Sequence, residues 1–320
     1  MVPPGYETVI FKLGHNAAMP APLLMIAATF LFATMGVCVK LASNYYDAGE
    51  LVMYRSIVGV TLMAAISLTQ GRSLRTRMPA MHFWRSLSGV IALSLWFYSI
   101  GHLPLATAMT LNYMSSVWMA LFMMGGAAVF GSARIDGRMV AAVLLGFAGV
   151  AMVLRPTMEQ QQLWYGLAGL LSGIMSALAY LQITALGRAG EPEYRIVFYF
   201  SLGGIAAGTL TTVTTSLVAG RNGWHGHSFK SAALLLAVGL LATSAQLLMT
   251  RAYGQGKTLV NASLQYLAIV FAAIYGATLF DEAVTTSAIA GMSTIVIAGL
   301  MAARLQAGKL KQQPLLIGEA

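Results

Sequence analysis

The sequence predicts an all-α polytopic membrane protein, and three observations lead to this fold class. Of the 320 residues, 58% are hydrophobic and 9% are charged, whereas a soluble globular domain has about 25% charged residues. The mean hydropathy is +0.73. The apolar residues form ten runs, most of them close to the roughly 20 residues that a membrane-spanning helix needs. The connections are short, so no soluble domain fits between the runs.

Each run is expected to form one transmembrane helix, antiparallel to the next because the loops are short. The fourth run begins directly after Pro104, which predicts a very tight turn from the third. The runs cover residues 20–40, 50–69, 81–101, 105–130, 138–155, 163–187, 195–218, 229–251, 258–280 and 285–303.

The positive charges orient the chain. With the N-terminus in the cytoplasm, 13 of the 19 Lys and Arg residues lie in inner segments and three in outer loops, while three lie within or at the ends of spans. Cytoplasmic loops carry such an excess of Lys and Arg. We therefore expect a bacterial inner-membrane protein with both termini in the cytoplasm. The net charge of +9 then reflects the inner loops and not a nucleic-acid partner.

Matching residues recur along the chain and predict an internal repeat. Leu111-Asn112-Tyr113 in the fourth run matches Leu264-Gln265-Tyr266 in the ninth, and Phe130 matches Phe280 at nearly the same offset. Each half then holds five spans. Because five is odd, the second half must insert upside down relative to the first.

The repeat divides the chain into two five-helix halves, at residues 20–155 and 163–303, with cytoplasmic segments at 1–19 and 304–320. Inverted repeats are an architecture of secondary transporters, which hold the substrate near the midplane between the halves. The alternative is an ancient duplication in a protein that does not transport.

Polar and aromatic side chains on the repeat-paired spans predict a substrate pocket. In the symmetric arrangement, Asn112 and Tyr113 of span four face Gln265 and Tyr266 of span nine. Amides and aromatic rings together suit a zwitterionic or heteroaromatic metabolite. The alternative is that these groups only bond the helices to one another. The residues that could complete the pocket are Trp96, Tyr98, Tyr180, Gln182, Tyr199 and Gln246.

Two arginines lie inside predicted spans. Arg55 is the stronger functional candidate, because its planar fork suits a carboxylate or phosphate of the substrate. The alternative for Arg55 is an ion pair with Asp47 or Glu50 at an outer gate. Arg85 is expected to be an interfacial anchor at the cytoplasmic end of span three, beside Trp84.

Acidic and histidine side chains are absent from the middle of every predicted span. Proton-driven transporters often relay protons through such groups. We therefore expect facilitated exchange, movement driven by the membrane potential, or coupling at the periphery through Asp47 and Glu50. No cofactor is expected, and His225-Gly226-His227 offers too few ligands for a metal site.

Smaller features are assigned to packing and anchoring. Gly169-x-x-x-Gly173 and Gly204-x-x-x-Gly208 allow close approach of helices and leave a monomer or a homodimer open. Lys40, at the outer end of span one, is expected to reach the headgroups as an anchor.

Short motifs occur at fixed places along the spans, and with the ten spans and the repeat they resemble the EamA-type transporters of the drug/metabolite transporter superfamily. The resemblance covers about residues 20–305. The motifs are Tyr54-Arg55-Ser56, Arg85-Ser86, His102-Leu103-Pro104-Leu105-Ala106, Gly146-Phe147-Ala148-Gly149-Val150, Arg155-Pro156 and Asp281-Glu282.

The resemblance implies a transporter of amino acids, nucleotide-like metabolites, vitamins or drugs, with export as the more common direction. The sequence departs from the family pattern in two places. Gly131-Ser132 stands where members usually have Gly-Glu. Thr34-Met35-Gly36 stands where subgroups that take up S-adenosylmethionine or riboflavin often have an Asp.

The sequence as a whole predicts a secondary transporter, not an enzyme, that exports or exchanges a small organic metabolite such as an amino acid, nucleoside-like compound or vitamin. The substrate is expected between spans three, four, eight and nine. An integral-membrane enzyme would need a His, Asp and Glu cluster near an interface, and a channel would need a continuous polar stripe. Neither pattern is visible in the sequence. A structural membrane protein is the third alternative.

Overall fold

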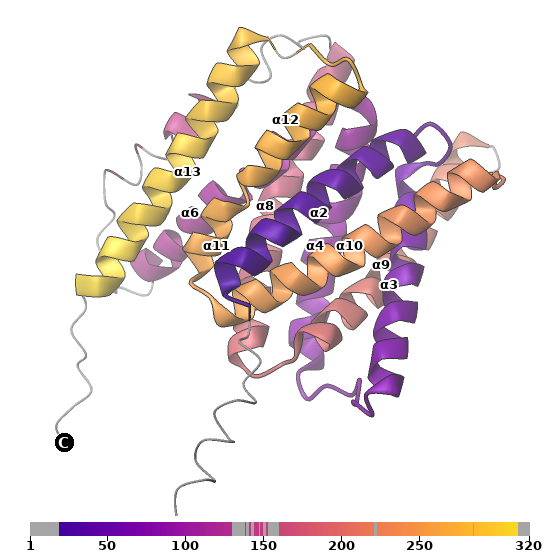
Figure 1. Cartoon of the computed structure of the whole chain (residues 1–320), viewed down its shortest axis with the longest axis horizontal. Helices are drawn as coiled ribbons and strands as arrows, with labels where there is room; N and C mark the ends of the chain where they lie inside the picture. The colour runs from indigo at the N-terminus through magenta and orange to yellow at the C-terminus, as the bar shows by residue number, and fades with distance from the viewer. Residues whose placement is uncertain are drawn as a thin grey trace, which may run out of the picture.

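The computed structural model describes residues 19–129, 160–220, 223–283 and 285–312, with isolated positions between 138 and 152. Within these ranges the chain is entirely helical, without a strand (Figure 1). The helices are α2 Ala21–Ala42, α3 Ala48–Thr69, α4 Pro79–His102, α5 Leu105–Tyr113, α6 Ser115–Val129, α8 Gln160–Arg188, α9 Glu193–Ala219, α10 Phe229–Gln255, α11 Thr258–Leu264, α12 Leu267–Leu279 and α13 Thr286–Gln312.

Nine of the ten predicted runs coincide with these helices; the fourth run corresponds to α5 and α6, and the ninth to α11 and α12. The fifth run, residues 138–155, lies largely outside the described residues, as do residues 1–18 and the pair Gly131-Ser132. Six described segments are long and apolar enough to cross a membrane: Ala21–Ala42, Ala48–Thr69, Leu163–Arg188, Glu193–Val218, Phe229–Gln255 and Val260–Leu279.

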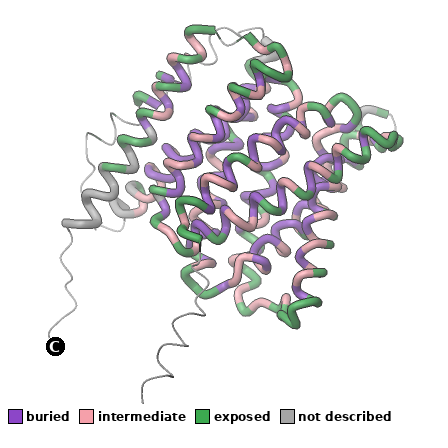
Figure 2. The backbone as a smooth tube through the Cα atoms, in the orientation of Figure 1, coloured by how far each residue is buried: buried purple, intermediate pink, exposed green. Residues whose placement is uncertain are grey.

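The outer surface of the bundle is apolar, as expected for a protein surrounded by lipid. Leu68, Trp164, Leu210 and Val218 are among the many large hydrophobic side chains that are exposed. Buried residues concentrate on the inward sides of the helices (Figure 2). So large an apolar surface would be a severe aggregation hazard in water, which agrees with a multi-pass membrane protein.

Local sequence signals set the helix boundaries. Pro79 stands at the start of α4 and Pro104 directly before α5, where a missing N–H is tolerated. Ser228 and Ser231 form a reciprocal capping box at the start of α10. Gly220 ends α9 in the left-handed conformation, with φ of 61°, a helix-ending position that favours glycine.

The two helices matched by the repeat are both interrupted, within two residues of equivalent places. The first break lies at Met114, directly after Leu111-Asn112-Tyr113. The second lies at Gln265 and Tyr266. At each break the helix tightens to i→i+3 hydrogen bonds, with distances of 2.9 Å from Val117 N to Met114 O and 3.0 Å from Ala268 N to Gln265 O. Discontinuous helices of this kind are typical near the substrate sites of secondary transporters.

Helices from the two sequence halves pack against each other throughout the bundle. Figure 1 shows α2 between α10 and α12, and both pairs are in contact. Likewise α3 packs on α9, and α4 packs on α8. The two halves therefore share one hydrophobic core, and Met25, Phe97, Leu111 and Tyr253 belong to it.

The glycine motifs make close contacts within the chain. A Cβ atom on Gly173 would lie 2.7 Å from the carbonyl oxygen of Leu111 in α5. A Cβ on Gly208 would lie 2.6 Å from the backbone nitrogen of Met53 in α3. These glycines therefore serve intramolecular packing, and they give no support to a homodimer.

We expect Gly173→Ala to destabilise the protein by about 1–3 kcal/mol, because the new methyl group would overlap backbone atoms that cannot move aside easily. Thermal unfolding in detergent measures the effect. Gly126→Ala is the matched control, since a Cβ there meets no atom within 4 Å. Equal melting temperatures for the two variants would contradict the close packing of α8 on α5.

Candidate functional site

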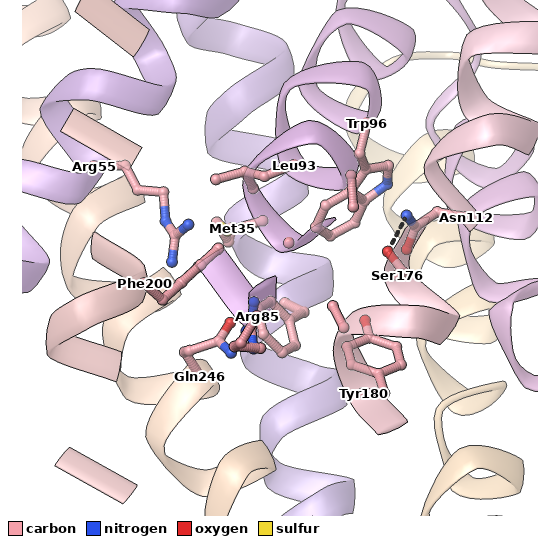
Figure 3. A pocket seen from close by; sticks show the side chains of 14 residues that line it. Met35, Arg55, Arg85, Leu93, Trp96, Asn112, Ser176, Tyr180, Phe200 and Gln246 are labelled. Carbon is pink, nitrogen blue, oxygen red and sulfur yellow. Dashed lines mark hydrogen bonds between the residues drawn. The ribbon is translucent and has the colours of Figure 1, made fainter. Parts of the chain in front are cut away.

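A small cavity of about 40 Å³ lies inside the bundle, enclosed by helices from both halves (Figure 3). Every residue that lines it is buried, except Tyr180, which is partly buried. The lining residues are Phe32, Met35, Arg55, Arg85, Gly89, Ala92, Leu93, Trp96, Asn112, Ser176, Ala179, Tyr180, Phe200 and Gln246.

Two arginines dominate the cavity. Arg55 from α3 and Arg85 from α4 are each only 2% exposed. Their guanidinium carbons lie 5.0 Å and 4.2 Å from the ring centre of Phe200 in α9, and Figure 3 shows both side chains directed toward that ring. A guanidinium over an aromatic face gains a cation–π interaction. Phe200 therefore provides a surface for both charges.

The local sequence provides room for Arg85. Gly89 lies one turn further along α4, and a Cβ atom there would overlap Nη1 of Arg85. The guanidinium thus occupies the space that a larger residue at position 89 would fill. Arg85-Ser86-x-x-Gly89 and Arg55-Ser56-x-x-Gly59 share this pattern, although Gly59 faces Ser201 instead of an arginine.

The arginine pair is electrostatically costly unless a negative charge lies beside it. The distances to Phe200 put the two guanidinium carbons at most 9.2 Å apart. Two positive charges at that separation repel by roughly 2 kcal/mol at an effective dielectric constant of about 20. Burial of an unpaired charge adds a desolvation penalty of several kcal/mol. Among the described residues, neither arginine has a carboxylate partner.

On the wall opposite the arginines, the Asn112 amide already has hydrogen-bond partners. Asn112 donates to Ser172 Oγ at 2.9 Å and to Ser176 Oγ at 3.2 Å, which bonds α5 to α8. Tyr180 stacks on Tyr253, with ring centres 5.4 Å apart. The interhelical bonding considered for these residues is therefore present at Asn112, in the wall of the cavity itself.

The structure brings five of the ten sequence-predicted binding residues to the cavity, namely Arg55, Trp96, Asn112, Tyr180 and Gln246. Three more are buried and do not line it. Tyr113 packs edge-on against Trp96, Gln265 Nε2 lies 3.6 Å from Met249 Sδ, and Tyr266 is 3% exposed.

Tyr98 and Gln182 do not belong to the cavity. Tyr98 is 41% exposed and packs on His102 at the end of α4. Gln182 accepts a hydrogen bond from Ser88 at 2.9 Å. The reason is helix geometry, since residues two apart point to nearly opposite sides. Trp96 and Tyr180 face inward, so Tyr98 and Gln182 cannot.

The prediction that Arg85 is an interfacial anchor was wrong. α4 begins at Pro79, so Arg85 lies well inside the helix, where α9 covers it. The neighbours Phe83 and Trp84 are 60% and 59% exposed and present the surface suited to an interface. Tyr199 is also outside the cavity and donates to the Leu74 carbonyl, while its neighbour Phe200 takes the cavity position that sequence reasoning missed.

Lys40 is also not a simple anchor. Its ammonium lies 2.6 Å from Glu282 Oε1 and 2.8 Å from the Leu103 carbonyl. Glu282 also accepts from the Leu105 backbone N–H at 2.9 Å and 3.1 Å. These contacts join the end of α2, the start of α5 and the turn after α12. We call this group the Lys40–Glu282 clamp.

A second polar cluster surrounds Glu50 in the first turn of α3. Glu50 is fully buried and accepts from the His225 backbone N–H at 3.0 Å and from His225 Nδ1 at 2.6 Å. His227 is hydrogen-bonded to the Tyr46 and Tyr54 hydroxyls. Glu50, which the sequence offered as an alternative ion-pair partner of Arg55, is thus bonded to a loop histidine instead. Asp47 stands at the N-cap of α3.

The histidines at 225 and 227 hold the loop before α10 against α3. No group of three His, Cys, Asp or Glu side chains in the described part of the chain could hold a metal ion.

At the other end of the bundle, Glu191 joins two loops. It is 6% exposed, accepts from Thr76 at 2.5 Å and pairs with Arg195 at 2.7 Å. Burial alone would raise the pKa of Glu191, but the hydrogen bonds and charge of these partners lower it below the ordinary value.

An all-helical bundle with an apolar surface, and with buried arginines in an internal cavity, agrees with a multi-pass membrane protein of the transporter class. Comparison with known proteins gives the family. The chain belongs to the EamA-like transporter family, within the drug/metabolite transporter superfamily: the family model matches residues 19–155, and a transporter relative is 31% identical over 89% of the chain. It is therefore a transporter and not an enzyme.

Three relatives illustrate the family. The pseudopaline exporter of Pseudomonas aeruginosa is 31% identical over 290 residues, covering 89% of this chain and 96% of the relative. An uncharacterized transporter of Helicobacter pylori is 23% identical, covering 90% and 96%. An S-adenosylmethionine uptake transporter of Rickettsia bellii is 21% identical, covering 78% and 82%.

One solved crystal structure matches with a TM-score of 0.64 at 18% identity, covering 91% of this chain and 99% of the other. At that identity the likeness shows the fold alone.

We expect Glu191→Gln to lower stability at neutral pH by about 1–3 kcal/mol, the effect of weakening a buried charged hydrogen bond. Because the pKa of Glu191 is lowered in the folded protein, its carboxylate stabilises the fold at neutral pH. That contribution is lost as the pH falls through the lowered pKa. The gap between the melting temperatures of wild type and variant should therefore close in acid. Thermal unfolding from pH 3 to pH 8 measures it. Glu193→Gln is the control, and a gap that is independent of pH would contradict the assignment.

Proposed function

We propose that this protein is a secondary transporter that exports a small organic metabolite across a bacterial inner membrane by alternating access. The single observation that carries the proposal is the narrow cavity, lined by buried side chains, between helices of the two sequence halves. In this proposal the chain forms ten spans, arranged as inverted halves at residues 20–155 and 163–303. Both termini lie in the cytoplasm.

The size of the cavity supports a mechanism with moving parts. Ligand pockets usually measure about 300–1,000 Å³, whereas this cavity measures about 40 Å³. A metabolite can enter only if the surrounding helices separate. In this proposal the narrow cavity belongs to a contracted state of the transport cycle, from which either side could open.

The interrupted helices are suited to such movement. Asn112 lines the cavity next to the break between α5 and α6. Ser116, just after this break, donates to the Ala262 carbonyl of α11 at 2.7 Å. The two interrupted helices are thus linked across the inverted halves, so a change of angle at one break is transmitted to the other.

Sequence similarity favours export over import. The relative with 31% identity is named as an exporter, and the relative named as an uptake transporter is 21% identical over a smaller share of both chains. A channel is disfavoured because the cavity is enclosed by buried side chains. A purely structural role leaves the buried arginine pair without a purpose.

Counterflow in proteoliposomes tests the proposal. Purified protein is first screened by thermal shift against amino acids, organic acids, nucleosides and vitamins. Compounds that raise the melting temperature are then loaded into the vesicles, and uptake of the labelled compound is followed. Saturable exchange that depends on the trapped compound supports the transporter. Flux that is linear with concentration indicates a channel and overturns the proposal, as does the absence of any flux for compounds that bind.

The Lys40–Glu282 clamp is expected to close the outer side, because the positive charges place the end of α2 outside. Glu282→Gln would remove the ion pair and weaken the hydrogen bond to α5. Since charged hydrogen bonds contribute about 1.5–3 kcal/mol each, the outward-open population should rise roughly tenfold or more.

Labelling from outside measures this rise. A cysteine replaces Thr107, which is 7% exposed and lies two residues after Leu105, in a Cys38→Ala background. Glu282→Gln should speed its reaction with an impermeant thiol reagent. The control is Asp281→Asn, which removes a neighbouring exposed acid. Equal labelling rates in the Glu282→Gln and Asp281→Asn variants would contradict a role of the clamp in closing the outer side.

A further inference from the structure

The cavity holds two positive charges, and none of the described residues that line it is negatively charged. Six acidic residues lie in the described part of the chain, and none lines the cavity. Glu50, Glu191 and Glu282 are engaged with His225, Arg195 and Lys40, respectively. Asp47, Glu193 and Asp281 lie at helix ends or in turns.

The unsatisfied atoms of the cavity are all donors. Among the buried nitrogen and oxygen atoms without a hydrogen-bond partner, those on cavity-lining residues are Arg55 Nε, Arg85 Nε, Arg85 Nη1, Trp96 Nε1 and Gln246 Nε2. Buried donors without acceptors are rare in folded proteins. A ligand that fills this cavity must therefore be rich in acceptors.

Phe200 does not substitute for that ligand. One ring faces both guanidinium groups. The face of an aromatic ring attracts positive charge, but it does not accept the hydrogen bonds that the guanidinium N–H groups donate in their own plane. A headgroup contact is also not available to either arginine, since both are 2% exposed. The described residues thus provide neither a counter-ion for these charges nor an acceptor for these donors.

We propose that the transported metabolite is an organic anion with at least two carboxylate groups, one held by Arg55 and the other by Arg85. This inference rests on the proposed transport function. Guanidinium and carboxylate form bidentate pairs, and two carboxylates neutralise both charges. The limit of 9.2 Å between the guanidinium carbons selects a compact molecule, with its acid groups a few bonds apart. Trp96 and Gln246 supply further donors for acceptor atoms between them.

The test uses purified full-length protein and α,ω-dicarboxylic acids of increasing chain length, each compared with its diamide at equal concentration. The diamide keeps the size and the acceptor oxygens but carries no charge. We expect the diacids to raise the melting temperature, with an optimum length, and the diamides to have no effect. Equal shifts for acid and amide would overturn the proposal.

Variants assign the effect to the arginines. Arg55→Gln and Arg85→Gln should each weaken diacid binding at least tenfold. Arg188→Gln, which removes an equal charge at the exposed end of α8, should leave binding unchanged. Arg55→Lys and Arg85→Lys keep the positive charge but lose the planar guanidinium group that binds a carboxylate through two hydrogen bonds. Diacid binding should therefore fall while the protein still folds.

The ligand-free proteins distinguish a binding role from a structural one. Because the two charges repel and lack partners, Arg85→Gln should not lower the melting temperature of the empty protein. A large loss of stability in both the Gln and the Lys variants, with diacid binding unchanged in the Lys variants, would identify a structural arginine and overturn the assignment.

The outcomes separate the two proposals. Diacids that bind but show no counterflow would contradict transport while the anion site stands. Saturable counterflow of an uncharged metabolite that is insensitive to both arginine substitutions would contradict the anion site while transport stands.

Discussion

Burial of two guanidinium groups without a counter-ion among the described residues is the constraint on which the rest of the structure depends. A charge inside a bilayer must face a polar interior or a partner. Here helices from both halves shelter the pair, since α3 and α4 carry Arg55 and Arg85 and α9 supplies Phe200. In the proposed mechanism, a ligand of opposite charge would offset this electrostatic cost. This uncompensated pair of buried positive charges is the clearest functional feature of the fold.

The symmetric breaks connect this site to the ends of the bundle. Asn112 lies two residues before the first break and is bonded to α8, and Gln265, its match in the sequence repeat, lies at the second break. The Lys40–Glu282 clamp joins the start of the first interrupted helix to the turn that follows the second. Contacts at the site and at the clamp therefore act on the same pair of helices.

Much of the fold could be predicted from the sequence, because apolar runs and charge bias are strong signals in membrane proteins. The interruptions could not, since neither Met114 nor Gln265 is a proline or glycine that marks a break. Only the repeat of Asn112-Tyr113 as Gln265-Tyr266 pointed to those positions, and it indicated symmetry without indicating a change of helix type.

The candidate site was predicted less completely, for reasons of helix geometry and tertiary packing. Treating Trp96 with Tyr98, and Tyr180 with Gln182, as joint lining residues ignored their opposite directions. Arg85 was predicted at the membrane interface because the sequence alone shows neither where α4 begins nor that α9 packs over the side chain. Lys40 and Glu282 lie far apart in sequence, and only the folded chain brings them together.

The small volume of the empty cavity has a consequence for the membrane. A space of about 40 Å³ holds no more than a few water molecules. A hydrogen-bonded file of water across a hydrocarbon layer of about 30 Å would need roughly ten molecules spaced about 2.8 Å apart. Within the described part of the chain, this cavity therefore cannot hold such a file, and it should give the bilayer no measurable proton leak when the protein has nothing to carry.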